Sequence, residues 1–201
     1  MLDGWARRLI DPALVRMASG LAGAGVSANA ITIAACVVGV AAAGAIALGN
    51  LWLGLAFLLL SRLGDGLDGA VARIKGKTDF GGYLDIVLDF VFYGAIPVGF
   101  AMLDPGANAL AACVLVLSFY VNGASFLAFA IMAEKRGLST DARGQKSLFF
   151  TTGLAEATET IAFFAVFCLF PGWFPILAYV FAAICFYTAL SRIVLASRMF
   201  R

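Results

Sequence analysis

Apolar residues run along this chain in long, nearly unbroken stretches that are separated by short polar joints. Six of the stretches reach the roughly 20 residues that a membrane-spanning helix needs. They cover residues 29–49, 51–73, 81–103, 107–133, 148–170 and 172–196. Most joints carry Gly, Pro, Asn or Asp, as is typical of turns, and only 134–147 is a longer polar loop. The pattern predicts an all-α, polytopic membrane protein with six transmembrane helices.

The first 25 residues follow a different pattern, because charged side chains alternate there with apolar ones. The apolar side chains recur at helical spacing, as in Trp5, Leu9, Leu14 and Leu21. Such a pattern predicts an amphipathic helix that lies in the membrane surface before the first span. We therefore expect two regions: an amphipathic juxtamembrane helix, 1–25, and a six-helix membrane domain, 26–201.

The composition agrees with a membrane protein and excludes several kinds of chemistry. Of the 201 residues, 63% are apolar and 13% are charged, whereas soluble domains are about half apolar and a quarter charged. The chain contains no His, which excludes Ser-His-Asp nucleophiles, His-ligated zinc and imidazole bases. A net charge of +2 is too small to indicate nucleic-acid binding. The expected surroundings are therefore a lipid bilayer.

The basic residues predict the orientation in the membrane. Every Lys and Arg except Arg62 lies at or beyond the end of a span on one side, and Arg62 lies within the second span, approaching that side. The joints on the other side carry no Lys or Arg. By the positive-inside rule, both termini are expected in the cytoplasm.

Four carboxylates lie where a membrane helix should be apolar. Asp65 and Asp68 follow the apolar part of the second span at i, i+3, and Asp85 and Asp89 precede that of the third at i, i+4. Each pair therefore shares one helix face. Because a short connection makes the two helices antiparallel neighbours, the pairs are expected to converge near the cytoplasmic end.

Carboxylates at membrane depth cost several kcal/mol unless they are paired or bind metal. Arg73 is the one cation of this motif, so protein groups alone are not expected to balance the negative charge of the four carboxylates. Oxygen ligands without His or Cys favour hard cations, which predicts one or two Mg²⁺ or Mn²⁺ ions. Two alternatives are helix-terminal aspartates in water, and the acids of a cation- or proton-coupled transporter.

The motif residues resemble a known family signature. The stretch Asp65-Gly-Leu-Asp68-Gly69-Ala-Val-Ala72-Arg73, followed by Gly81-Gly-Tyr-Leu-Asp85-Ile-Val-Leu-Asp89, closely resembles the CDP-alcohol phosphotransferase pattern D-x2-D-G-x2-A-R-x8-G-x3-D-x3-D. The turn before Gly81 is one residue shorter than in that pattern. Residues 153–161 are similar to a bacterial inner-membrane subgroup of this CDP-alcohol phosphatidyltransferase family.

The resemblance implies a fold of six helices behind an amphipathic helix, in a homodimer of the bacterial inner membrane with its active site on the cytoplasmic side. It also implies transfer of a phosphatidyl group from CDP-diacylglycerol to an alcohol, with release of CMP. In that reaction Asp65, Asp68 and Asp85 match the metal ligands. Asp89 matches the general base and is a further candidate ligand.

The same resemblance implies which residues contact the CDP group. They are Asn29, Asp68, Gly69, Arg73, Thr78 and Gly81. Gly69 and Gly81 would let a phosphate or nucleotide approach the backbone, and Arg73 can bind phosphate oxygens. Asn29 and Thr78 are equally well explained as helix caps.

The acceptor pocket is expected around the fourth loop and the fifth and sixth spans. Its candidate residues are Arg143, Lys146, Glu156, Glu159 and Arg192. The cations favour a phosphate-bearing acceptor such as glycerol 3-phosphate. The two glutamates instead favour an amino-alcohol or polyol, of the serine, choline or inositol type.

Overall fold

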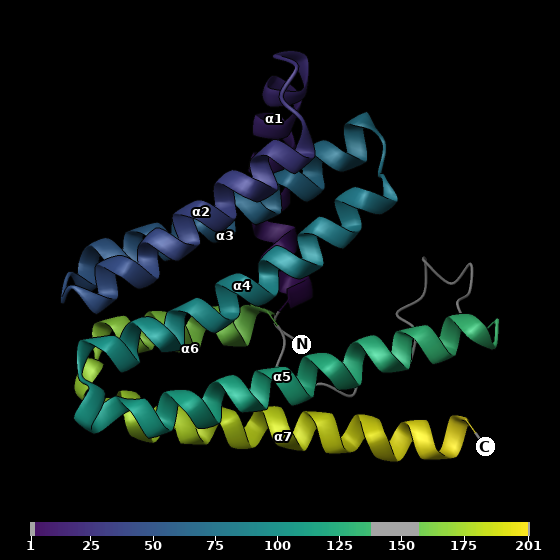
Figure 1. Cartoon of the computed structure of the whole chain (residues 1–201). Coiled ribbons are helices and arrows are strands. Elements are labelled where there is room, and N and C mark those ends of the chain that lie inside the picture. The colour runs from purple at the N-terminus through teal and green to yellow at the C-terminus, as the bar shows by residue number, and fades with distance from the viewer. Residues whose placement is uncertain (1–2, 138–156, 201) are drawn as a thin grey trace.

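The computed structural model of the chain describes residues 3–137 and 157–200, with side chains from residue 13 onward. The described elements are all helical (Figure 1). They are α1 (Asp3–Gly23), α2 (Ala28–Ala47), α3 (Leu51–Lys75), α4 (Asp79–Leu103), α5 (Pro105–Lys135), α6 (Ala157–Leu169), the short 3-10 turn η2 (Pro171–Trp173) and α7 (Phe174–Met199). The expectation of an all-α fold is confirmed over this part of the chain.

Four helical stretches are long and apolar enough to cross a membrane. They are Ala28–Ala47, Asp79–Leu103, Pro105–Lys135 and Pro171–Met199. The helix α3 is as long as α4, but Arg62, Asp65 and Asp68 make it more polar. The helix α6 is apolar and shorter, and the remainder of the predicted fifth span lies outside the described residues. The count of six spans therefore stays a prediction.

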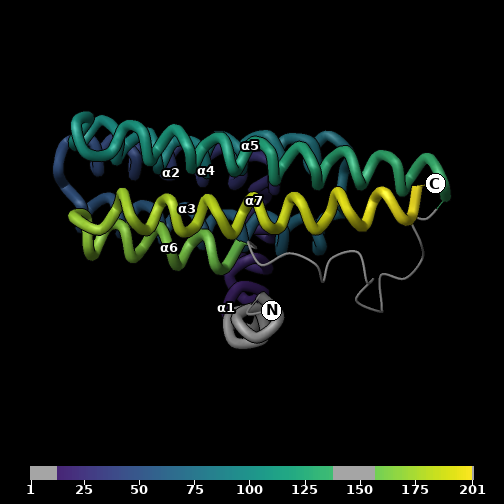
Figure 2. Tube along the Cα trace, turned by 90° about the horizontal axis from the view of Figure 1, so that it is seen from below, coloured from purple at the N-terminus to yellow at the C-terminus, as the bar shows by residue number. Residues whose placement is uncertain are grey.

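The first helix lies across the bundle, as Figures 1 and 2 show from two directions. Its Ala18 is fully buried and packs with Ala70 and Val71 of α3. Leu14 lies close to Gly66, also on α3. The helix α1 thus covers the half of α3 that carries the aspartates, while its placement at a membrane surface stays a prediction.

Small residues place α2 at the centre of the first three spans. A Cβ added to Gly64 of α3 would lie 2.8 Å from the Cβ of Ala35, and one added to Gly99 of α4 would lie 2.6 Å from the Ala43 carbonyl oxygen. Glycine and alanine thereby allow both helices to pack tightly on α2. The backbones of α3 and α4 approach each other less closely than either approaches α2. The space between α3 and α4 is therefore left for long side chains.

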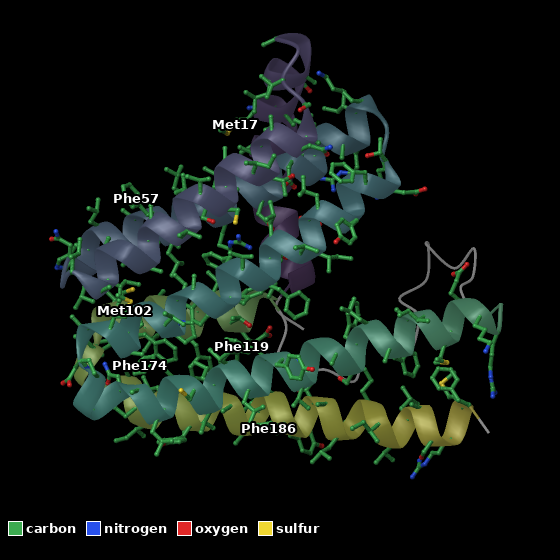
Figure 3. All side chains as sticks on the ribbon, in the orientation of Figure 1. Met17, Phe57, Met102, Phe119, Phe174 and Phe186 are labelled. Carbon is green, nitrogen blue, oxygen red and sulfur yellow. The ribbon has the colours of Figure 1, made fainter. Side chains whose placement is uncertain are left out.

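A phenylalanine-rich core joins these helices to the remainder of the bundle. The rings of Phe100 on α4 and Phe174 on α7 stack with centroids 4.6 Å apart, and both are fully buried. Figure 3 shows Phe174 and Phe119 in the half of the bundle that holds α5, α6 and α7. This packing fixes α4, which carries the candidate site residues Gly81, Asp85 and Asp89, against the C-terminal helices.

Candidate functional site

Three of the four aspartates meet between α3 and α4. One carboxylate oxygen from each of Asp65, Asp68 and Asp85 lies within 4.8 Å of the other two. Asp65 and Asp68 share a face of α3 because they are one turn apart. Asp68 is buried, and its Oδ2 atom has no hydrogen-bond partner among the described residues. The predicted convergence of the two acidic pairs is therefore observed for three of their four members.

This arrangement fits a divalent metal ion. An ion that binds oxygen at about 2.1 Å places opposite ligands about 4.2 Å apart, so small side-chain rotations bring the three carboxylates into range. The donors are all carboxylate oxygens, which suit hard cations such as Mg²⁺ and Mn²⁺. A buried carboxylate oxygen without a hydrogen-bond partner also lowers the stability of the fold unless a cation binds it. The residues present therefore suit such an ion.

The fourth aspartate, Asp89, is bound by an arginine. Nη1 of Arg62 donates a hydrogen bond of 2.8 Å to Asp89 Oδ1, and the same nitrogen lies 3.4 Å from Asp65 Oδ1. Arg62, which lies before the motif, therefore adds a cation to the site that the sequence analysis did not assign to it. The sequence contained a signal only for the contact with Asp65, because Arg62 precedes Asp65 by three residues and so lies on the same helix face.

The Arg62 side chain is held from several directions. Its Nη2 donates to Ser61 Oγ at 3.2 Å, and that hydroxyl donates to the Ala35 carbonyl oxygen at 2.7 Å. Its guanidinium carbon lies 3.7 Å from the centroid of the Phe92 ring, a cation–π contact. Contacts with α3 and α4, and the link through Ser61 to α2, together fix the guanidinium between the helices.

Gly69 and Arg73 lie one turn apart in the last part of α3. A Cβ added to Gly69 would meet nothing nearer than Arg73 Nη1, at 3.8 Å. The surface of α3 at Gly69 is therefore open, and close helix packing does not explain the glycine. An arginine beside an accessible stretch of helix can bind a phosphate oxygen.

Gly81, Thr78 and Asn29 form a second small group at the start of α4. Thr78 is the N-cap of α4, and its Oγ1 accepts a hydrogen bond from Gly81 N at 3.0 Å. A Cβ at Gly81 would lie 2.9 Å from Thr78 Oγ1 and 3.0 Å from Asn29 Oδ1. The N-cap of α2 is Ser27, so Asn29 is not explained by capping.

The candidate acceptor residues lie apart in what the structure describes. Arg143, Lys146 and Glu156 lie outside the described residues. Arg192 on α7 donates from Nη1 to the backbone oxygen and Oδ1 of Asn122, both at 3.0 Å, and to Ser125 Oγ at 2.6 Å. Glu159 on α6 has a buried Oε2 atom that finds no hydrogen-bond partner in the described part. Arg192 therefore binds α5 and makes no ion pair with Glu159.

A family profile and a curated relative both match nearly the whole chain. The family profile described as CDP-alcohol phosphatidyltransferase matches residues 25–191. The inner membrane protein YnjF of Escherichia coli (strain K12) is 42% identical over 193 residues, which are 96% of this chain and 94% of that protein.

Solved structures with the same fold come from the Mycobacterium tuberculosis phosphatidylinositol phosphate synthase PgsA1. Its crystal structure with CDP-DAG bound has a TM-score of 0.67 at 23% identity and covers 90% of this chain and 91% of that one. Its complex with manganese and citrate has a TM-score of 0.70, also at 23% identity, and covers 90% and 87%.

Proposed function

This chain belongs to the CDP-alcohol phosphatidyltransferase family, and from that premise we propose that it transfers a phosphatidyl group from CDP-diacylglycerol to an alcohol and releases CMP. The observation that carries the proposal is the meeting of Asp65, Asp68 and Asp85 around a point that suits a divalent ion. A transporter is disfavoured, because the chain is an enzyme of this family.

Breaking the diphosphate of the donor places negative charge on the departing CMP. A divalent ion held at this site would supply positive charge to neutralise it and to orient the diphosphate. In this chain Asp65, Asp68 and Asp85 would hold the ion. Arg73 would bind a phosphate oxygen beside the open surface at Gly69, which is consistent with the absence of packing there. Asn29 and Gly81 would lie beside the nucleotide.

Asp89 is proposed as the general base. Its Oδ1 accepts the hydrogen bond from Arg62, and its second oxygen has no partner among the described residues. This carboxylate oxygen can accept the proton of the acceptor hydroxyl while the hydroxyl oxygen attacks the phosphorus of the donor and CMP departs. Asp89 is also a candidate metal ligand, and the Asp89→Asn variant distinguishes the two roles.

The related solved structures support the choice of donor and cofactor. The Mycobacterium tuberculosis synthase has been crystallised with CDP-DAG and, separately, with manganese and citrate. Together with the carboxylate geometry, this supports CDP-diacylglycerol as the donor and Mg²⁺ or Mn²⁺ as the cofactor. We propose one or two ions at the site.

For the acceptor, the described contacts favour an amino-alcohol or polyol over a phosphate-bearing alcohol. Arg192, one of the cations that favoured a phosphate, already donates to Asn122 and Ser125 on α5. Glu159 has a buried oxygen without a hydrogen-bond partner among the described residues. A second hydroxyl of a polyol, or the ammonium N–H of an amino-alcohol such as serine, would donate a hydrogen bond to this oxygen. Glycerol 3-phosphate is the competing acceptor, for which Arg143 and Lys146 remain candidate ligands.

We further propose that the protein spans the bacterial inner membrane six times as a homodimer, with both termini and the active site on the cytoplasmic side. The inner-membrane location is supported by the relative of 42% identity. The orientation is supported by the one-sided distribution of Lys and Arg in the sequence.

The proposal is tested with the purified full chain in detergent. The protein is supplied with CDP-diacylglycerol, Mn²⁺ or Mg²⁺, and in turn serine, choline, inositol and glycerol 3-phosphate. We expect CMP release that requires both the metal and one class of alcohol and that stops on adding EDTA. No CMP with any acceptor and either metal would contradict the proposal.

A further inference from the structure

Arg62 brings a permanent positive charge into the group of aspartates. Its side chain is only 9% exposed, and its Nη1 atom lies between Asp89 Oδ1 and Asp65 Oδ1, at 2.8 and 3.4 Å. We propose that Arg62 is a positioning residue that engages Asp89 Oδ1, so that Asp89 stays out of the group of three metal-binding carboxylates, and fixes Asp89 for proton transfer. This inference rests on the proposed function, in which Asp89 is the base.

The surroundings of Arg62 make it the fixed member of the pair. Ser61 links it to the backbone of α2, and the Phe92 ring of α4 lies under its guanidinium plane. Asp89 has fewer restraints, because its described hydrogen bonds come from Arg62 and its side chain is 31% exposed. The arginine therefore sets the orientation of the carboxylate.

The cost of burying Arg62 also argues against a purely structural role. Its Nε atom is buried without a hydrogen-bond partner among the described residues, although the guanidinium could donate there. A buried unsatisfied donor costs stability. An apolar residue would join α3 to α4 without that cost, so the arginine is better explained by its two carboxylate partners.

The proposed role predicts opposite effects on metal binding and on turnover. With Arg62 present, its charge opposes a cation at Asp65, and its hydrogen bond keeps Asp89 from becoming a further ligand. Without it, the site gains negative charge and Asp89 is released, so a divalent ion binds more tightly. Turnover nevertheless falls, because the base is no longer held in position.

The test compares Arg62→Gln and Arg62→Lys with the unmodified full chain. For Arg62→Gln we expect Mn²⁺ to bind about threefold more tightly or better, measured without substrate as Mn²⁺-dependent thermal stabilisation. We expect kcat to fall about 10- to 100-fold, with the KM for CDP-diacylglycerol within about threefold of the original. Arg62→Lys keeps the charge, so its Mn²⁺ affinity stays near the original while kcat recovers only in part.

Arg198→Gln is the matched control, because it removes the same charge from an exposed position on α7 and should change neither quantity. A parallel loss of Mn²⁺ affinity, thermal stability and kcat in both Arg62 variants would show a merely structural role and overturn the inference. An unchanged kcat in Arg62→Gln would overturn it as well. Absence of CMP release by the unmodified protein would instead contradict the proposed function, while the metal-binding comparison would still report on Arg62.

Discussion

The hydrogen bond from Arg62 Nη1 to Asp89 Oδ1, 2.8 Å long, connects two helices whose backbones do not pack closely against each other. Glycine and alanine contacts instead draw α3 and α4 separately onto α2. The resulting space between α3 and α4 holds the carboxylates, and one arginine spans it. The separation of α3 and α4 thus lets carboxylates from both helices face one another, where a tightly packed helix pair would not.

Removing any of the three converging carboxylates should abolish metal use. We expect Asp65→Asn, Asp68→Asn and Asp85→Asn each to lower CMP release at least about 100-fold and to lose Mn²⁺-dependent thermal stabilisation, because a neutral amide is a poor ligand for a hard cation. Asp79→Asn is the control, since Asp79 lies exposed in the first turn of α4. Near-normal rates in all three site variants would rule out this metal site.

Changing Asp89 should separate chemistry from donor binding. Asp89→Asn keeps an oxygen that can accept the hydrogen bond from Arg62, so the fold should be retained. Without a base, turnover should fall about 100-fold or more, while the affinity for CDP-diacylglycerol stays within about threefold. Equilibrium binding of the donor in the presence of Mn²⁺ measures this. A collapse of donor affinity in this variant would identify Asp89 as a metal ligand instead.

Two glycines of α3 should respond differently to alanine. Gly69→Ala should leave thermal stability unchanged, because the nearest atom to the added Cβ is 3.8 Å away, yet it should raise the donor KM about tenfold if a phosphate approaches there. Gly64→Ala should instead lower stability by about 1–3 kcal/mol, because its Cβ would lie 2.8 Å from the Ala35 Cβ. Melting curves and donor KM values distinguish the two. An unchanged donor KM in Gly69→Ala would place the phosphates elsewhere.

The acceptor KM values of two variants should identify the class of acceptor. With the donor saturating, Glu159→Gln should raise the acceptor KM about tenfold or more if the acceptor donates hydrogen bonds to this carboxylate, whereas Arg192→Gln should leave it nearly unchanged. The reverse pattern would support a phosphate-bearing acceptor. If neither variant changes the KM, the acceptor binds away from both residues.

Much of the site could be predicted because helical spacing alone places Asp65 with Asp68 and Asp85 with Asp89, and a short connection brings the pairs together. The contact between Arg62 and Asp89 could not be predicted with the same ease. It depends on how far α3 and α4 lie apart, and that distance follows from the packing of each helix on α2. Sequence spacing indicated only that Arg62 and Asp65 share a helix face.

The role of Arg192 was harder still to predict. Its position near the end of the last span suggested a free cation for the acceptor, but the pairing of α7 with α5 places Asn122 and Ser125 within hydrogen-bond distance. Nothing in the spacing of residues 122 and 192 indicates that contact. Thr78 illustrates the opposite case, because its position before a predicted helix already indicated the capping role that the structure confirms.

Metal-dependent phosphatidyl transfer is tested by measuring CMP and newly formed phospholipid in the same reaction, with the unmodified chain and with Asp85→Asn. We expect equal amounts of the two products from the unmodified chain in the presence of Mn²⁺ and the correct alcohol, and neither product from the variant. CMP accompanied by phosphatidic acid in place of a phosphatidyl alcohol, or equal product formation by Asp85→Asn, would contradict it.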